Sequence, residues 1–187
     1  MQHHEVLLIF CLFIEIINIG PNVTQNIKSM IPSWLIIGIV TLAIPFSCNR
    51  LISSRDLRWF KRLRRPNWLT FEWAIPIIWT VVFICGAWSA YNVWSANPGT
   101  ISTWLLMAFY IVVETAISLY TLVMCKTRSL KVGTVIGGTG FFLGAILAVA
   151  VLTISNTAFW LLVPYLLWSP VGTFVTWQMM QLNPIDA

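Results

Sequence analysis

Residues 132–154 read VGTVIGGTGFFLGAILAVAVLTI, a run of 23 residues without a charged side chain. A helix of about 20 apolar residues spans the hydrocarbon core of a bilayer, because each residue rises about 1.5 Å along the axis. Lipid offers no hydrogen-bond partners to exposed backbone amides, so such a segment crosses the membrane as an α-helix. This stretch therefore predicts an integral membrane protein.

Four further apolar stretches are long enough to span a bilayer, so the sequence predicts an all-α membrane protein, a bundle of five transmembrane helices. The composition agrees, because 58% of residues are hydrophobic and 9% are charged, whereas about a quarter of residues are charged in soluble domains. The connections are short, so consecutive helices are expected to be antiparallel neighbours. The predicted spans are residues 31–48, 73–94, 101–125, 132–154 and 157–180.

The N-terminal part of the chain differs from these spans. Its apolar run, residues 6–19, contains Glu15 and is too short to cross a bilayer. We therefore divide the chain into an N-terminal extension, residues 1–29, and a five-helix domain, residues 30–187. The extension is interpreted either as an interfacial helix or as a segment upstream of a natural start at Met30, and its deletion is expected to leave an inserted protein.

Basic residues gather in the segments that a five-span topology places on one side of the membrane. Ten of the eleven lysines and arginines fall there, and Lys28 falls on the opposite side. Because cytoplasmic loops are enriched in lysine and arginine, loops 53–72 and 126–131 are predicted to be cytoplasmic. A net charge of +5 that is confined to the ends of apolar spans argues against a nucleic-acid partner.

The loop at residues 53–72 combines six basic residues with Trp59, Phe60 and Trp68. This composition is typical of a segment that lies at an anionic headgroup surface. A solvated basic loop that only sets the topology explains it equally well.

Glu114 is the one ionisable side chain well inside a predicted span. A carboxylate at that depth costs a few kcal/mol or more unless it is protonated, paired or facing a cavity. Tyr110, Ser118 and Thr121 follow helical spacing around Glu114, so a polar stripe is expected to face the bundle interior. Two interpretations stay open: a protonated carboxyl group hydrogen-bonded to those hydroxyls, or a group that binds a ligand or moves a proton.

Glycines line one face of the fourth predicted span, with the spacing that places them along a single helical stripe. Such a face favours close helix packing in membranes. The packing partner is either another span or a second copy of the chain in a homodimer. The glycines are Gly133, Gly137, Gly140 and Gly144.

Tryptophan is unusually frequent, with eleven residues in the chain. Trp79, Trp88 and Trp168 are predicted to lie inside spans rather than in the interfacial belt where tryptophan usually occurs. Their flat apolar rings, each with one N–H donor, suit a pocket for a flat aromatic or sterol-like ligand. They could equally fill space between helices.

The sequence contains no catalytic or metal-binding pattern. Histidine is absent from every predicted span, and the four cysteines are far apart. Conventional hydrolytic or acid–base catalysis is therefore not expected, and no metal or required cofactor is predicted.

Several tryptophan-containing motifs follow one another in a fixed order. They are Trp59-Phe60, Arg65-Pro66-Asn67-Trp68, Trp73 and Trp79-Thr80, and in the last span Pro164-Tyr165-Leu166-Leu167-Trp168, with Gly172-Thr173 and Leu182-Asn183 after it. From about residue 31 to residue 184 the sequence resembles the tryptophan-rich sensory protein (TspO) family, which includes the mitochondrial translocator protein.

The resemblance implies a bundle of five transmembrane helices. It implies porphyrins, haem-related tetrapyrroles and, in animal members, cholesterol as ligands, bound in a pocket closed by the first loop and lined by the second and fifth spans. The residues that this places at the ligand are Trp68, Trp73, Trp79, Trp168 and Gly172, and we add Glu114 from the polar stripe.

The third span departs from the family pattern. Tyr110 and Glu114 stand where the family has glutamine and asparagine, and Ile117 stands at a family tryptophan. Near the end of the last span, Gln181 stands at the arginine of the animal sterol motif, so cholesterol recognition through that motif is not expected.

The predicted function is that of a membrane protein that binds a hydrophobic small molecule, most plausibly a porphyrin or haem-related tetrapyrrole. Its role is expected in stress sensing, tetrapyrrole regulation or transport. The expected partners are this ligand and the lipid bilayer, with a homodimer left open. Two alternatives are a small transporter that uses Glu114 as its coupling group and a light-dependent enzyme that degrades porphyrin.

Overall fold

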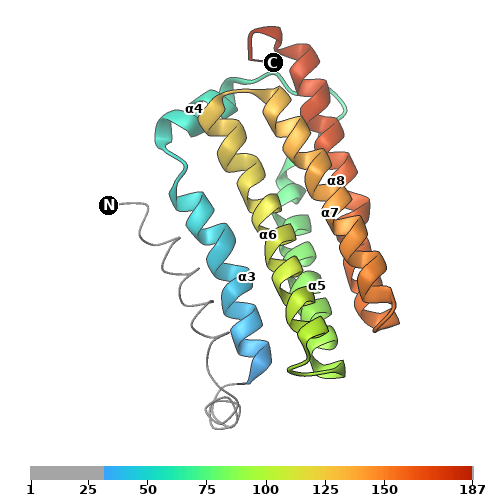
Figure 1. Ribbon diagram of the computed structural model, residues 1–187. Helices are drawn as coiled ribbons and strands as arrows, with labels where there is room; N and C mark the ends of the chain where they lie inside the picture. Colours follow the sequence, from blue (N-terminus) through green and yellow to red (C-terminus); the bar gives the residue numbers. More distant parts are fainter. Residues whose placement is uncertain (1–31, 187) are drawn as a thin grey trace.

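The computed structural model describes residues 32–186, and its helices follow the apolar stretches of the sequence (Figure 1). Within this part of the chain, five helices are long and apolar enough to cross a membrane, which confirms the predicted five-span fold. The predicted extension, residues 1–29, lies outside the described residues. The helices are α3 (Ser33–Arg50), α4 (Ser54–Arg62), α5 (Ile75–Ala96), α6 (Ile101–Thr127), α7 (Leu130–Leu152) and α8 (Asn156–Leu182), with 3-10 turns η1 (Glu72–Ala74) and η2 (Pro184–Asp186).

Hydroxyl side chains fix where the later helices begin. Thr100, Ser129 and Ser155 each precede a helix, and each accepts a hydrogen bond from the backbone N–H three residues further on, at 3.2–3.4 Å. Such caps satisfy amides that have no partner within the helix. Arg128 takes a left-handed conformation at the end of α6, with φ of 50°. The chain therefore reverses within two residues, and α7 returns beside α6.

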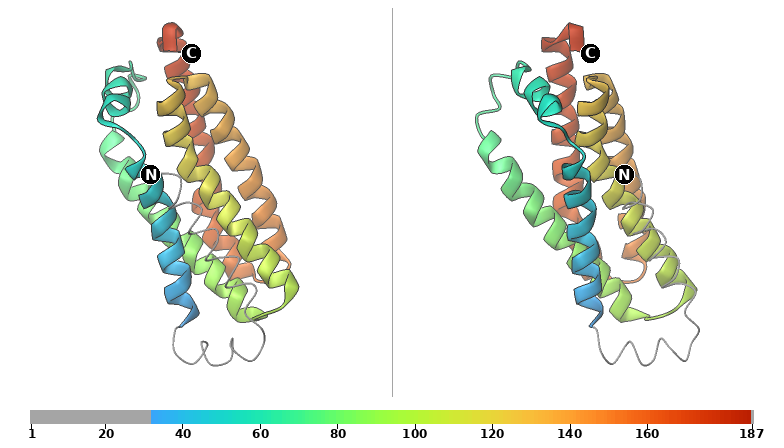
Figure 2. Two further views of the ribbon diagram at one scale, coloured as in Figure 1. Left: turned by 60° about the vertical axis from the view of Figure 1, so that its left-hand side comes forward. Right: turned by 90° about the vertical axis from the view of Figure 1, so that its left-hand side faces the viewer.

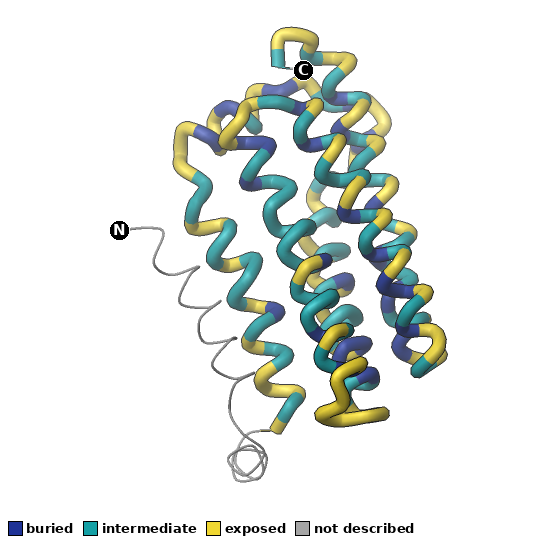
Figure 3. Tube along the Cα trace, in the orientation of Figure 1, coloured by how far each residue is buried: buried dark blue, intermediate teal, exposed yellow. Residues whose placement is uncertain are grey.

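The spans form a closed ring in the order α3, α5, α8, α7, α6. The pairs α6–α7 and α7–α8 are consecutive neighbours, as predicted. Consecutive packing is wrong for α5 and α6, which have few contacts with each other, because α5 packs mainly against α8 and α3. Figure 2 shows α5 and α6 diverging away from the turn that joins them. The space between them is closed by α3, whose one buried residue is Thr41 (Figure 3).

The glycine face of α7 packs inside the bundle rather than against a second copy. A methyl group at Gly133 would lie 2.6 Å from Sδ of Met124 on α6, and one at Gly144 would collide with Cε1 of Tyr165 on α8. Since a real Cβ does not approach ring carbons so closely, glycine at 144 allows α7 to lie this near α8, whereas at Gly133 the flexible Met124 side chain would have to shift.

Helix α4 lies across the end of the bundle that also holds the C-terminus (Figure 1). Trp59 is 3% exposed and packs against Met124, Cys125 and Met179. Its indole Nε1 donates a hydrogen bond of 2.7 Å to Oδ1 of Asp186. Trp59 therefore anchors α4 to the bundle, and whether the basic segment 53–72 lies at lipid headgroups stays a prediction.

An ion pair joins α4 to α6. Nζ of Lys126 lies 3.0 Å from Oδ2 of Asp56, which also accepts a hydrogen bond of 2.9 Å from the backbone N–H of Ser53. Hydrogen bonding with Ser53 and the ammonium of Lys126 lower the pKa of Asp56 to about 2. The ten lysines and arginines among the described residues all lie near this end of the bundle, since it contains α4, the α6–α7 turn and the end of α3.

Candidate ligand cavities

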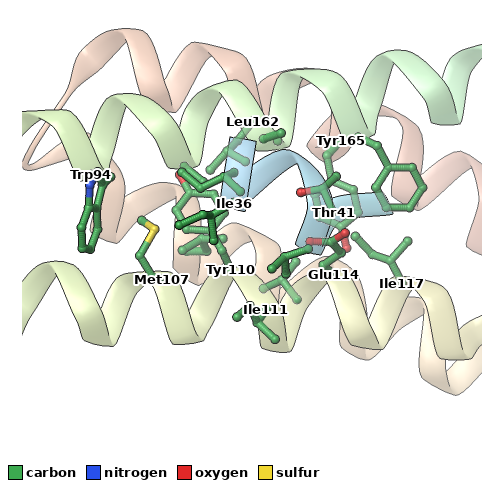
Figure 4. Close-up of a pocket in the computed structure, with 18 of the residues that line it drawn as sticks. Ile36, Thr41, Trp94, Met107, Tyr110, Ile111, Glu114, Ile117, Leu162 and Tyr165 are labelled. Atoms are coloured by element: carbon green, nitrogen blue, oxygen red, sulfur yellow. The ribbon is translucent and has the colours of Figure 1, made fainter. Parts of the chain in front are cut away.

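A cavity of about 200 Å³ lies where α5 and α6 diverge, and we call it the main cavity. Its walls come mostly from α3, α5 and α6, and Leu147, Leu162 and Tyr165 of α7 and α8 close its inner side. In Figure 4, Trp94 and Met107 lie towards one end of this cavity. Thr41, Glu114, Ile117 and Tyr165 lie towards the other end. All five spans therefore contribute to one largely apolar chamber.

A hydrogen-bonded chain fixes one polar side of the main cavity. Oγ of Ser89 donates to the backbone carbonyl of Ala158 at 2.6 Å and lies 2.6 Å from the hydroxyl of Tyr110. Serine has a single hydroxyl hydrogen, so the Tyr110 hydroxyl must be the donor in the second bond. Tyr110 therefore has no hydrogen left for Glu114, and its oxygen can only accept a further bond.

Glu114 lies at the middle of α6 and lines the main cavity. Its Oε1 is buried and has no hydrogen-bond partner among the described residues. Oγ of Ser118 is also buried without a partner there. The proposed bonding of the Glu114 carboxyl group to Tyr110 or Ser118 is therefore not observed. The carboxyl group instead reaches the cavity beside Thr41 (Figure 4).

A second, smaller cavity of about 30 Å³ lies between α5, α6, α7 and α8, and we call it the small cavity. Trp79 and Gly172 line it, as do Ile117 and Tyr165, which also line the main cavity. A side chain at Gly172 would meet no atom within 4 Å of its Cβ. The two cavities are therefore separated by a wall that Ile117 and Tyr165 share.

Four aromatic rings from the first loop and α8 form what we call the loop aromatic group: Trp68, Phe71, Trp168 and Phe174. Trp68 lies 6.2 Å from Phe71 and 6.2 Å from Phe174, and Phe71 lies 6.4 Å from Trp168, between ring centroids. These separations are typical of favourable aromatic pairs. Nε1 of Trp68 donates a 2.5 Å hydrogen bond to Gln178. Nε1 of Trp168 is buried and has no partner in the described part of the chain.

The predicted ligand-binding residues thus fall into separate places. Trp68 and Trp168 belong to the loop aromatic group, Trp79 and Gly172 line the small cavity, and Glu114 lines the main cavity. Trp73 lies on the outside of the bundle with 74% of its surface exposed. Trp88 lies within α5, as predicted, but 59% of its surface is exposed and it lines neither cavity.

Sequence reasoning missed residues that shape the main cavity. Thr41, Ser89 and Tyr165 were not among the predicted ligand-binding residues, although Thr41 and Tyr165 line this cavity and Ser89 orients Tyr110. Tyr165 was visible as part of a motif. Ser89 and Thr41 are isolated small hydroxyl residues in apolar helices, where the sequence alone does not indicate their partners.

Comparison with known proteins agrees with this architecture. The model of the TspO/MBR family matches residues 32–182. An uncharacterized membrane protein of Bacillus subtilis, YtaB, is 28% identical over 155 residues, which cover 80% of this chain and 95% of that protein. The tryptophan-rich protein TspO of Bacillus cereus is 26% identical over 154 residues, 81% of this chain and 97% of that protein. The chain is a multi-pass membrane protein and belongs to the TspO/MBR family.

Proposed function

We propose that the protein binds a tetrapyrrole between the first loop and α8, where the loop aromatic group and the small cavity adjoin the same helix. The observation that carries this proposal is the Trp168 indole, whose N–H group is buried without a partner among the described residues and whose ring meets Phe71 edge to face. A porphyrin offers a large flat apolar surface to such rings. Its carboxylate side groups offer acceptors for an indole N–H.

Binding of so large a ring requires the loop to separate from α8. The small cavity of about 30 Å³ is far below the roughly 300–1,000 Å³ of typical small-molecule pockets. Trp68 is 41% exposed and is held against α8 by its bond to Gln178 and by the ring of Phe174. Opening at residues 68–71 breaks these contacts and leaves the two bonds between Arg64 and Asn183 in place, and its cost is offset by the apolar area that a bound tetrapyrrole would bury.

The test is a titration of the purified full-length protein with protoporphyrin IX, followed by quenching of tryptophan fluorescence. Trp168→Ala removes a wall of the site and is expected to weaken binding about ten- to a hundredfold, which corresponds to about 1–3 kcal/mol. Trp79→Ala is expected to weaken it similarly. Trp88→Ala is the matched control, because this exposed tryptophan lies outside both cavities.

A second substitution tests the site without removing an aromatic ring. Gly172→Leu is expected to fill the small cavity and to abolish binding, since its Cβ meets no neighbour within 4 Å. Gly38→Leu is its control, because Gly38 also has open space around a Cβ but lies on α3, outside both cavities. Absence of saturable quenching in the wild type, or normal binding by Trp168→Ala and Gly172→Leu together, would refute the proposal.

A transporter role is a second candidate, favoured by the unpartnered carboxyl oxygen of Glu114 at the middle of a span. Ionisable groups at this depth are typical of ion and proton pathways. Ligand flux is measured across vesicles that contain the wild type or Glu114→Gln. A protein that only binds gives no flux in either form, whereas a transporter coupled through Glu114 gives flux in the wild type and loses it in the variant.

A further inference from the structure

The main cavity is separate from the proposed tetrapyrrole site. It opens where α5 and α6 diverge and extends from Glu114 to Trp94, towards the turn at residues 97–100. No member of the loop aromatic group lines it. The tetrapyrrole proposal therefore does not account for the residues that line the main cavity, and a different ligand has to be considered for them.

The walls of the main cavity are largely apolar. At the middle of α6, Glu114 offers an unpartnered carboxyl oxygen, and Tyr110, one turn earlier, offers an oxygen whose hydrogen is committed to Ser89. Both groups are acceptors. Thr41 and Tyr165 line the same end of the cavity, and each carries one hydroxyl hydrogen, so together they satisfy at most two of the four lone-pair positions of a carboxylate. The polar centre is therefore built to receive hydrogen bonds from a donor.

We propose that the main cavity is a second ligand site, which binds a compact amphiphilic amine with its ammonium group on Glu114 and its apolar body between α3, α5 and α6. An ammonium group supplies three donors and a positive charge, and both properties match a carboxylate that has an unpartnered oxygen and an acceptor, the Tyr110 hydroxyl oxygen, one turn away on the same helix. Pairing also removes the cost of holding that carboxylate alone at membrane depth. A cavity of about 200 Å³ admits a compact body such as a cage hydrocarbon rather than a long chain.

The fold offers this ligand a way in. Helix α3 forms one wall of the cavity, and Thr41 is its one buried residue. An element with so little buried surface separates from its neighbours more readily than the others do. Gly86 of α5 also lines the cavity. A Cβ there would meet nothing within 4 Å, so a side chain introduced at this position has room to extend into the cavity.

The experiment compares two probes of nearly equal shape, 1-aminoadamantane and 1-adamantanol, by isothermal titration of the full-length protein in nanodiscs. The wild type is expected to bind the amine saturably and more tightly than the alcohol. Glu114→Gln keeps the shape of the side chain but removes its charge, so the dissociation constant of the amine is expected to rise about tenfold or more. Binding of the alcohol is expected to change by less than about twofold, since it loses no charge-assisted bond.

Cavity-filling substitutions provide a test that does not depend on Glu114. Gly86→Leu is expected to abolish binding of the amine, because its side chain occupies the space of the ligand. Gly38→Leu on α3 is expected to leave it unchanged, since Gly38 lies outside the cavity. Protoporphyrin IX should still bind to Gly86→Leu, which separates a failure of this proposal from a failure of the tetrapyrrole site.

Three results would overturn the proposal. The first is a wild type that binds neither probe, or binds the alcohol as tightly as the amine. The second is a Glu114→Gln protein with the melting temperature of the wild type and unchanged amine affinity, which would mean that Glu114 is protonated and donates to an oxygen such as that of Tyr110. The third is normal amine binding by Gly86→Leu.

Discussion

Replacing Gly144 by alanine tests whether the close approach of α7 and α8 determines the stability of the bundle. The added Cβ would collide with Cε1 of Tyr165, and it would lie 2.9 Å from Cδ1 and 3.2 Å from Cζ of the same ring. Tyr165 is 5% exposed and packs in the main apolar core. The ring is rigid, so either it or the whole of α7 must shift. Gly138→Ala is the matched control, because nothing lies within 4 Å of its Cβ.

Overpacking of this kind costs about 1–3 kcal/mol. Alanine also gains about 0.5–1 kcal/mol over glycine in a helix, but this gain applies to both variants and cancels in their difference. The melting temperature of Gly144→Ala in detergent is therefore expected to lie roughly 2–12 °C below that of Gly138→Ala, on the scaling of soluble domains of similar length. Equal melting temperatures would show that the Tyr165 ring moves into the adjoining cavities at no cost, and the reasoning would fail.

Two further predictions concern the end of the bundle that carries α4. The pKa of Asp56 is lowered to about 2 from its ordinary value of 3.8, so its ionised form stabilises the fold above about pH 4, and this contribution is lost as the pH falls towards 2. Asp56→Asn should therefore melt below the wild type at pH 7, with a gap that narrows between about pH 4 and pH 2; a constant gap would contradict stabilisation by the ionised Asp56 carboxylate. The basic loops are predicted to be cytoplasmic. The test introduces single cysteines into a variant in which the four native cysteines have been replaced. A cysteine at Ser54 should react with a membrane-impermeant reagent from the cytoplasmic side, and a cysteine at Ser95 should react from the opposite side. Equal reaction of both cysteines from one side would contradict the topology.

The number of spans could be predicted from the sequence because one requirement determines it. A membrane helix must contain enough consecutive apolar residues, and this property is local. Which helices pack together is not local. The sequence predicted α5 and α6 as neighbours because a short turn, residues 97–100, joins them, yet the contacts of α5 are made mainly with α8 and α3.

Helix α4 likewise combines a local feature that the sequence shows with a long-range contact that it does not show. Ser53 and Asp56 form a capping box, with a backbone N–H to carboxylate bond of 2.9 Å and a return bond of 3.3 Å, and this S-x-x-D pattern was readable in the sequence. The partner of Trp59 was not readable, because Asp186 lies 127 residues further on. The composition of segment 53–72 fitted a membrane surface or a solvated loop equally well, and neither interpretation indicated that Trp59 anchors α4.

The environment of Glu114 was partly predictable. Helical spacing correctly placed Tyr110 on the same stripe, since both residues line the main cavity. It could not show that the Tyr110 hydroxyl donates to Ser89 on α5, which in turn donates to a carbonyl of α8. That chain of bonds depends on three helices, and it decides that Tyr110 can only accept a bond at the cavity.

Buried polar groups without partners connect the fold to its proposed functions. Lipid supplies no water to such groups, so each one lowers stability unless something else satisfies it. Elsewhere in this bundle the fold does satisfy them, as in the bond between Tyr120 on α6 and Thr176 on α8. Four side chains among the described residues are exceptions. Glu114 adjoins the main cavity, Tyr165 lies between the two cavities and Trp168 lies among the loop rings, whereas Ser118 lines neither cavity. Packing alone gives no reason for the first three, whereas binding does, because a ligand that enters these places supplies the missing partner and regains the lost free energy.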